Sequence, residues 1–326
     1  MGVDQSADSP SWPRIVAVIG GGTMGLGFAE LLSGAGLTVR LCDASSELTR
    51  QSLERLAERV RGHVEAGLLE PAAIERAASV EGADDVAAAV QGAELVIEAV
   101  PEQLELKLEI LPAIEAAADP EAVITSNTSS FSIKELSGAI ERRGRFLGMH
   151  WFNPPEWVPG VEIIPVEETE PEVVERTQEL LRRLGKRPAV VGDEVGFVAN
   201  RLQSALLREA LACVREGLVE PADLDEVVRS CFGFRLPFFG PFRILDMAGL
   251  DVQLSVFETL EGGLGERFAA TDAKDDLGSR VDAGRTGTKS GGGFFDYSDE
   301  ERDRLLIERD RRYAALAELL ERLPPP

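Results

Sequence analysis

Residues 14–36, RIVAVIGGGTMGLGFAELLSGAG, decide the fold. The first part, RIVAVIG, is a short β-branched apolar run of the kind found in buried parallel strands. Gly20, Gly22 and Gly25 follow it in the pattern G-x-G-x-x-G, and the residues after them have helical periodicity. A glycine-rich turn with a purely structural role is the alternative, but a strand before it and a helix after it favour a pyrophosphate-binding turn. The stretch therefore predicts the start of a dinucleotide-binding domain.

The three glycines have separate tasks in such a turn. The first makes a tight turn, the second lets backbone amides approach the pyrophosphate, and the third allows the helix to pack closely on the strand. Thr23 and Met24 lie inside the same turn, and we count them with the cofactor-binding residues.

A second apolar run, LTVRLCD, ends on Asp43. A carboxylate at this spacing accepts hydrogen bonds from the adenine-ribose hydroxyls and repels a 2'-phosphate. The sequence therefore predicts NAD as the cofactor in preference to NADP.

Further along the chain, apolar runs at 93–100, 122–127, 145–152 and 161–166 alternate with helical segments, of which 45–67 is the longest. This alternation predicts an α/β domain with a doubly wound parallel, Rossmann-type sheet over 14–194. From 195 onward the pattern is helical only, so we expect a helical C-terminal domain over 195–326 that carries the substrate cleft and a dimer interface. The boundary falls in VGDEVG at 191–196, and residues 1–13 are expected to form a disordered leader without signal-peptide character.

Composition narrows the class of protein. A chain of 326 residues has room for two domains, and its formal charge of -23 disfavours binding to nucleic acid or to anionic membranes. No stretch reaches the ~18 apolar residues of a membrane helix, so we expect a cytoplasmic protein. Cys42, Cys213 and Cys231 are widely spaced and are interpreted as reduced core thiols, and no metal site is expected.

The chain has only two histidines, which shortens the search for a general base. His63 lies among charged residues of the long helical segment, which favours a solvated surface position. His150 follows the apolar run RFLGM, at the carboxyl edge of the predicted sheet, where ligands of open α/β folds bind. A structural histidine with satisfied hydrogen bonds is the alternative at this position.

Glu162 begins the apolar run VEIIPV, which is an unusual place for an unpaired carboxylate. If it accepts a hydrogen bond from the ring of His150, it fixes the tautomer and raises the basicity of the other ring nitrogen. Removal of a hydroxyl proton together with hydride transfer needs such a base.

Several ordered motifs occur along the chain: SNTSS (126–130), GMHWFNPP (148–155), GFVANRL (196–202), GPFRILDMAGLD (240–251) and GRTGTKSGGGFFDY (284–297). Together they resemble the L-3-hydroxyacyl-CoA dehydrogenase family over residues 14–297. The resemblance implies that His150 and Glu162 are the catalytic pair and that Ser129 and Asn200 hydrogen-bond the reacting oxygen, as neutral donors would. It also places Glu102, Lys107, Asn153 and Lys289 around the cofactor or the active site. Helix capping by Ser129 and a surface position for Lys289 are the structural alternatives.

Departures from the family pattern concern the substrate. CoA-using members have a lysine late in the helix after the second strand, and Ala66 stands at the nearest position here. The loop PPEWVPGVE (154–162) and the segment SCFGFRLPFFGPF (230–242) also differ from the CoA-using pattern. These features resemble the short CoA-independent branch that includes L-gulonate 3-dehydrogenase, lambda-crystallin and carnitine dehydrogenase. Arg235 then becomes a candidate to hold a free substrate carboxylate, with an ion pair to a surface acid as the alternative.

Three functions remain open. The first is NAD-dependent oxidation of a small L-3-hydroxy acid, and the second is oxidation of a 3-hydroxyacyl-CoA, with its place in fatty acid metabolism. The third is a non-catalytic, crystallin-like NAD-binding protein, for which the full set Ser129, His150, Glu162 and Asn200 has no physical need. A dehydrogenase with a lysine base is disfavoured because no lysine occurs between Val195 and Ala273.

Overall fold

The computed structural model describes residues 13–237, 240–241, 259–260, 263–264, 283–284, 290–292 and 298–322. It divides into two compact units, Met1–Asn200 and Arg201–Pro326. The helical segment predicted at 240–260 and the candidate residue Lys289 lie largely or wholly outside the described residues. The domain boundary predicted near 195 stays a prediction.

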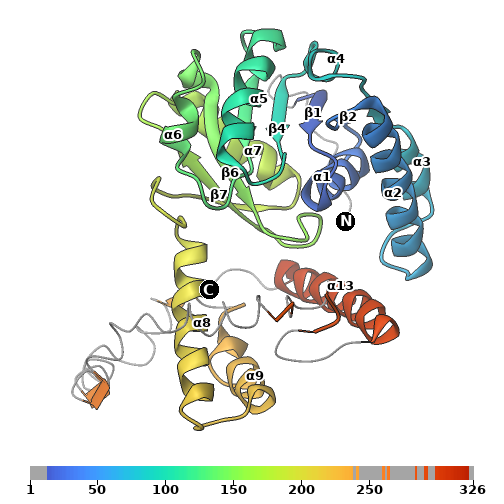
Figure 1. The fold of residues 1–326 in the computed structure, drawn as a ribbon. Coiled ribbons are helices and arrows are strands. Elements are labelled where there is room, and N and C mark those ends of the chain that lie inside the picture. Colours follow the sequence, from blue (N-terminus) through green and yellow to red (C-terminus); the bar gives the residue numbers. More distant parts are fainter. Residues whose placement is uncertain are drawn as a thin grey trace. The chain divides into compact units, whose positions relative to one another are not determined.

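One eight-stranded sheet organises the first unit, in the order β3-β2-β1-β4-β5-β6-β7-β8 (Figure 1). The strand order reverses beside β1, since β2 and β4 both pair with it in parallel. Ligands of open α/β sheets bind outside the carboxyl ends of the strands at such a switch point. The strands are β1 (Ile15–Ile19), β2 (Thr38–Cys42), β3 (Glu81–Gly82), β4 (Leu95–Glu98), β5 (Val123–Ser126), β6 (Phe146–Trp151), β7 (Gly160–Pro165) and β8 (Arg187–Val190).

Helices cover both faces of this sheet, and the alternation of β1 shows why. Val16 and Val18 belong to one buried apolar cluster, and Ala17 and Ile19 belong to the other. A strand that is apolar on both sides must be covered on both sides, so the Rossmann-type α/β expectation is confirmed. The helices of this unit are α1 (Thr23–Gly34), α2 (Ser46–Glu65), α3 (Ala72–Ala78), α4 (Val86–Val90), α5 (Leu104–Ala117), α6 (Ile133–Ser137) and α7 (Pro171–Arg183), with a short 3-10 turn at Arg143–Arg145.

The sheet is not parallel throughout, which corrects the prediction. β6 and β7 pair in antiparallel fashion, whereas all other pairs are parallel. Only residues 152–159 separate these two strands, and a parallel crossover needs about a dozen residues or more. The sequence pattern also missed the short strands β3 and β8, and three of the four residues of β8 are exposed.

The described residues of the second unit are helical apart from turns and one isolated bridge residue. They include α9 (Pro221–Ser230), a 3-10 turn at Gly233–Arg235 and α13 (Asp299–Arg322), while α8 (Ala199–Arg215) begins in the first unit. The helical C-terminal domain expected from the sequence is therefore found. Across the described ranges, no helix combines the length and apolar character that crossing a membrane requires.

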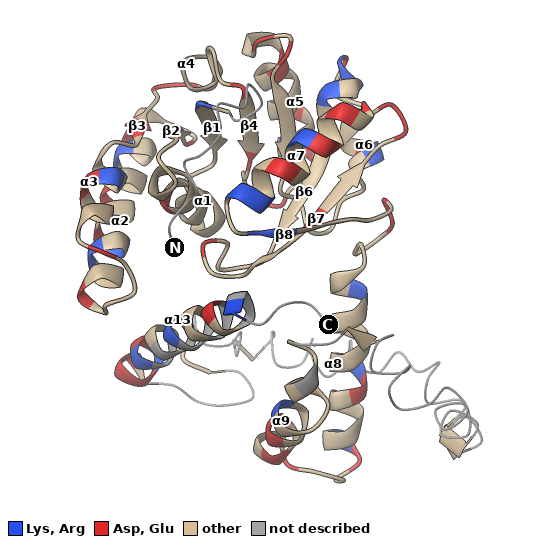
Figure 2. Ribbon diagram, turned by 180° about the vertical axis from the view of Figure 1, so that it is seen from behind, with Lys and Arg blue, Asp and Glu red and all other residues tan. Residues whose placement is uncertain are grey.

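Surface composition follows the expectation for acidic residues but not for all cysteines. Figure 2 marks acidic residues in red on helices of both units, on α3 and α7 of the first and on α13 of the second. All three cysteines are free, as expected, and Cys42 is buried. Cys213 is half-buried and Cys231 is exposed, because Cys231 follows the last residue of α9 and does not lie on a packed helix face. The prediction that all three are core thiols is wrong for Cys231.

Candidate active site

The glycine turn has the geometry that a dinucleotide requires. Gly20 has φ +112°, and a Cβ there would lie 2.4 Å from the carbonyl oxygen of Ala99. A Cβ on Gly25 would lie 1.8 Å from the carbonyl oxygen of Gly20, so the third glycine is needed for helix packing. A Cβ on Gly22 would meet nothing within 4 Å, and Gly22 is the N-cap of α1, whose first turn has no acidic residue. The open space at this helix N-terminus fits a pyrophosphate.

Thr23 and Met24 are the first residues of α1, where Thr23 is exposed and Met24 is half-buried. Their backbone amides belong to the first helical turn, whose donors have no partner within the helix. This is the position from which a helix binds an anion.

Asp43 lies directly after β2, beside the glycine turn. One carboxylate oxygen accepts from the amide of Ala44 at 2.8 Å and the other from the hydroxyl of Ser52 at 3.1 Å. A Cβ on Gly21 would lie 2.6 Å from that second oxygen, so the carboxylate packs against the turn. A fixed carboxylate beside the glycine turn fits the ribose hydroxyls of NAD.

His150 and Glu162 face each other across the antiparallel pair β6·β7. Their Nδ1 and Oε2 atoms lie 2.8 Å apart, and both side chains are buried, so the predicted hydrogen bond is present. The other oxygen of Glu162 accepts from the amides of Val198 and Ala199, at 3.1 and 2.9 Å. Both partners of this carboxylate oxygen are neutral backbone amides, so neither places a positive charge on Glu162. With Nδ1 donating to Glu162, Nε2 is the ring nitrogen of His150 that this hydrogen bond leaves unused.

The backbone before α8 explains how two amides reach Glu162. Gly196 has φ 76° and Phe197 has φ 48°, so two consecutive residues are left-handed. A left-handed conformation is unusual for a bulky residue and costs on the order of 1–3 kcal/mol, which the surroundings must offset. The Phe197 ring is buried and lies 5.4 Å from the ring of His150. Its packing holds the bend that directs the next two amides at Glu162.

Ser129 and Asn200 are brought together by one hydrogen bond. The amide nitrogen Nδ2 of Asn200 donates to the carbonyl oxygen of Ser129 at 3.0 Å. Asn200 follows Ala199, whose amide donates to Glu162, and Glu162 in turn contacts His150. The four predicted catalytic residues are thus connected through hydrogen bonds and through adjacent positions in the chain.

Glu102 organises the turn that carries Ser129. One of its carboxylate oxygens accepts from the hydroxyl of Thr128 at 2.7 Å, from the amide of Ser129 at 2.8 Å and from the hydroxyl of Ser130 at 2.8 Å. Burial by itself raises the pKa of Glu102. These hydrogen bonds and the charge of Lys107 outweigh that effect and lower the pKa to about 2. Glu102 is therefore charged and holds the turn at 128–130, called the serine turn below. The sequence predicted only that Glu102 lies around the cofactor or the active site.

Lys107 lies beneath this turn and is almost fully buried. Its Nζ is 2.6 Å from a carboxylate oxygen of Glu98 and 3.3 Å from one of Glu102. Ser126 donates to the second oxygen of Glu98. Sequence reasoning placed Lys107 near the cofactor, and in the structure it forms ion pairs with the carboxylates of Glu98 and Glu102.

Other site residues fall into three groups. Asn153 follows β6 and is exposed. Arg235 ends the 3-10 turn of the second unit, but its side chain, like all of Lys289, is outside the described structure. Sequence reasoning missed Glu98 and Asn127, whose side chain accepts from the amide of Trp151 at 3.1 Å. Glu98 ends the apolar strand LVIE, so the signal that found Glu162, an acid in an apolar run, also applied to it.

His63 is not the solvated residue that its neighbours in sequence suggest. Its side chain is 14% exposed, and Nδ1 lies 2.7 Å from an oxygen of Glu30. Leu56 and Val60 are buried on the same helix, and His63 continues their spacing toward the sheet. That periodicity was the available signal.

Comparisons with known proteins agree with this geometry. The family model for the NAD binding domain of 3-hydroxyacyl-CoA dehydrogenase matches residues 15–194, and the model for its C-terminal domain matches residues 196–297. The chain belongs to the 3-hydroxyacyl-CoA dehydrogenase family. It is accordingly an NAD-dependent dehydrogenase that acts on a CH-OH group.

Individual members of the 3-hydroxyacyl-CoA dehydrogenase family differ in substrate. The chain is 38% identical to 5-formyl-3-hydroxy-2-methylpyridine 4-carboxylate 5-dehydrogenase of Mesorhizobium japonicum, covering 94% of this chain and 98% of that protein. A solved structure of a dehydrogenase of this kind, described as an NAD+ dependent dismutase, has a TM-score of 0.84 at 36% identity and covers 95% of this chain and 99% of that one. A probable 3-hydroxybutyryl-CoA dehydrogenase of Bacillus subtilis is 32% identical over 87% of this chain and 98% of its own length.

Proposed function

We propose that the chain oxidises the 3-hydroxyl of a small L-3-hydroxy acid with a free carboxylate, reversibly, to the 3-oxo acid. The observation that carries this proposal is the buried His150–Glu162 pair, in which neutral amides hold the second carboxylate oxygen. Nε2 of His150 takes the hydroxyl proton, and Glu162 stabilises the imidazolium that results. Bound NAD supplies a nicotinamide ring that accepts the hydride from the hydroxyl-bearing carbon.

Ser129 and Asn200 act on the reacting oxygen. A hydroxyl and a side-chain amide are neutral donors. They stabilise the negative charge that this oxygen carries during ketone reduction without transferring a proton to it. The contact between Asn200 and the Ser129 carbonyl orients both residues. Glu102 in turn fixes the Ser129 turn through its backbone.

The basic residues near the end of α2 favour a free acid over a CoA thioester. Ala66 is the C-cap of α2 and supplies no cation. Arg59 and Arg61 would be the alternatives for CoA phosphates, but the guanidinium of Arg59 is paired with Glu30 and Glu156, which leaves only the exposed Arg61 of the two. The name of the Mesorhizobium relative describes a substrate with a free carboxylate, which supports the same choice.

A 3-hydroxyacyl-CoA substrate is the second candidate, favoured by the similarity to the Bacillus subtilis protein. The third function considered from the sequence, a non-catalytic role, is not proposed, because the chain belongs to a family of dehydrogenases and a purely structural protein does not need Ser129, His150, Glu162 and Asn200 together.

We also propose assignments in the second domain, taken as 195–326. Arg235 holds the substrate carboxylate with a bidentate guanidinium, Lys289 lies near the cofactor, and the domain forms a homodimer interface. In the first domain, Asn153 is also proposed to lie near the cofactor. We also propose that the chain belongs to the CoA-independent branch that includes L-gulonate 3-dehydrogenase. Light scattering of the purified protein tests the dimer.

A substrate panel tests the function. NADH absorbance is followed with small 3-oxo acids, with a formyl-pyridine carboxylate and with acetoacetyl-CoA. We expect turnover of a free acid, and Arg235→Leu should raise its KM by about 10- to 150-fold, since a charge-assisted pair contributes roughly 1.5–3 kcal/mol. Efficient turnover of acetoacetyl-CoA without activity on any free acid would overturn the proposed substrate and leave the family assignment intact.

A further inference from the structure

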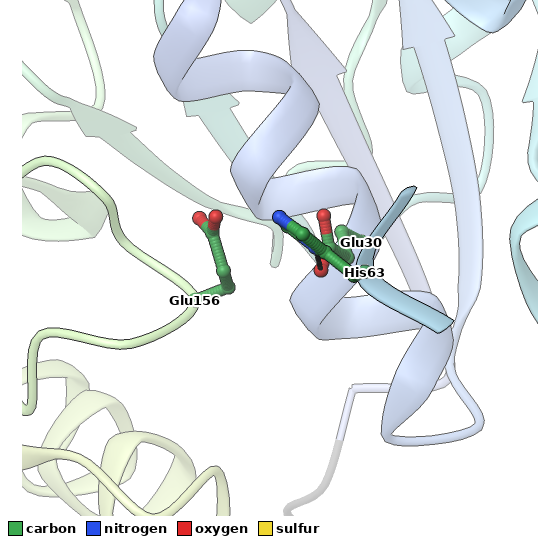
Figure 3. Close-up of side chains that lie close together, drawn as sticks. All are labelled: Glu30, His63 and Glu156. Atoms are coloured by element: carbon green, nitrogen blue, oxygen red, sulfur yellow. Dashed lines mark hydrogen bonds and ion pairs between the residues drawn. The ribbon is translucent and has the colours of Figure 1, made fainter. Parts of the chain in front are cut away.

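A second cluster of carboxylates and imidazole lies apart from the catalytic pair. Glu30 comes from α1, His63 from α2 and Glu156 from the loop 152–159 that joins β6 to β7 (Figure 3). One oxygen of each carboxylate and one ring nitrogen of His63 lie within 4.8 Å of one another. Figure 3 shows the His63 ring and the Glu156 carboxyl group facing each other. Three elements distant in sequence thus converge on one point.

Arg59 fixes the orientation of both carboxylates. Its Nε lies 2.9 Å from Oε2 of Glu30, and its other nitrogen NH2 pairs with Oε1 of Glu156. The side chains of Glu30 and Glu156 are only 5% and 4% exposed. Each carboxylate therefore has one oxygen held by the arginine and a second oxygen that the arginine does not occupy.

The second oxygen of Glu156 has no hydrogen-bond partner among the described residues, although it is buried. A Cβ on Gly27 would lie 2.6 Å from this oxygen, so the glycine is what lets the carboxylate approach α1. An unpartnered buried carboxylate oxygen is costly unless a further group completes its contacts.

We propose that Glu30, His63 and Glu156 bind a divalent transition-metal ion, of which Zn²⁺ is the member that best matches the ligands. One imidazole nitrogen and two carboxylate oxygens are ligands that zinc accepts in four-coordinate sites, and water supplies the fourth. Arg59 then holds the outer oxygens of both carboxylates, as hydrogen-bonding partners of metal ligands do. Sequence reasoning expected no metal, because the ligands lie far apart in the chain.

The metal site stabilises the loop that follows His150. Lys186 already holds this loop, since its Nζ donates to the carbonyl oxygens of Pro155 at 2.6 Å, Val158 at 3.1 Å and Glu156 at 3.2 Å. A metal bound by α1, α2 and the loop adds a cross-link among three elements. Because it binds the folded chain and not the unfolded one, Zn²⁺ raises the unfolding temperature.

Calorimetric titration of the full-length, chelator-treated protein with Zn²⁺ tests the site. We expect one ion per chain and a higher unfolding temperature. Glu156→Gln and His63→Gln should each weaken binding at least ~10-fold, as loss of a ligand does. The matched control is Glu58→Gln, an exposed acid on the same helix, which should bind as the wild type does.

Two other potential zinc ligands are removed in separate proteins. Cys231→Ser removes the exposed thiol, and His150→Gln removes the catalytic imidazole. Retained binding in both supports the site. Binding that Glu156→Gln and His63→Gln leave unchanged, or that Cys231→Ser or His150→Gln abolishes, overturns it, as does the absence of any stoichiometric binding by the wild type.

If Glu156→Gln and His63→Gln do not fold, the visible absorption of bound Co²⁺ tests the metal site instead. Co²⁺ added to the folded Cys231→Ser and His150→Gln proteins should give the visible bands of a four-coordinate nitrogen and oxygen site. Zn²⁺ should displace it and remove the bands. Absence of the bands in these folded proteins overturns the proposal.

Discussion

The two histidines of the chain each pair with a glutamate, but the second oxygen of that glutamate is held differently. His150 lies 2.8 Å from Glu162, whose other oxygen accepts from two backbone amides. His63 lies 2.7 Å from Glu30, whose other oxygen pairs with Arg59. Amide donors carry no net charge, so Glu162 remains able to stabilise a protonated imidazole, whereas Arg59 offsets the charge of Glu30. The difference separates a pair suited to proton transfer from one suited to structure or to a cation.

The largest effect is expected when the imidazole of His150, the proposed base, is removed. His150→Gln should lower kcat by about 10²- to 10⁴-fold, the usual contribution of a general base. Steady-state turnover with the best substrate of the panel measures it. A fluorescence titration should show NADH affinity near the wild-type value, and near-normal kcat in this variant would contradict the assigned role.

The counterpart on the other pair is a change in stability. Arg59→Met leaves Glu30 and Glu156 buried without their cation, so the free energy of unfolding in urea should fall by about 3 kcal/mol when chelator is present. Arg61→Met, on the exposed face of the same helix, should change it by less than about 0.5 kcal/mol. Equal effects of the two substitutions would show that the buried ion cluster contributes nothing.

Glu162→Gln tests the role of the negative charge next to His150, because it keeps the shape of the side chain and removes the charge of the carboxylate. The glutamine cannot stabilise an imidazolium as a carboxylate does, and loss of a charged hydrogen bond of roughly 1.5–3 kcal/mol corresponds to a decrease in kcat of about 10- to 150-fold. The measurement is kcat at saturating substrate. A variant with wild-type kcat would mean that the carboxylate only holds the backbone of α8.

The smallest effect concerns Glu102, a third glutamate held mainly by neutral donors. Its pKa in the folded chain is about 2, below the ordinary value of 4.5, so its stabilising contribution is complete above the ordinary value and is lost as pH falls through about 2. Because the side chain is 35% exposed, we expect only about 1 kcal/mol after screening. The difference between the free energies of unfolding of wild type and Glu102→Gln, measured in urea, should therefore shrink as the solution is acidified. A gap that stays constant with pH would contradict this.

The fold was predictable where its determinants are local. The glycine turn, Asp43 at the end of β2 and the strand and helix patterns all lie within short windows, and local sterics fix them. The orientation of β7 was missed, although the short connection 152–159 excludes a parallel crossover. This correction matters, because antiparallel register places Glu162 opposite His150.

The contacts of His63 and Glu102 were less predictable. Glu30 and Glu156 are 33 and 93 positions from His63 in the chain, and nothing in the neighbourhood of His63 indicates them. Glu102 was assigned by resemblance to the cofactor region, whereas its contacts are to the serine turn. Such contacts depend on tertiary packing, which one sequence without an alignment does not specify.

The amides of Val198 and Ala199 have a use outside catalysis. Amides in the first turn of a helix lack helical acceptors and ordinarily exchange their hydrogens rapidly with solvent. Here both donate to the buried carboxylate of Glu162, just after the left-handed Phe197. Slow deuterium uptake at these two positions therefore reports that the base and its carboxylate are correctly arranged, in a resting protein to which no substrate has been added.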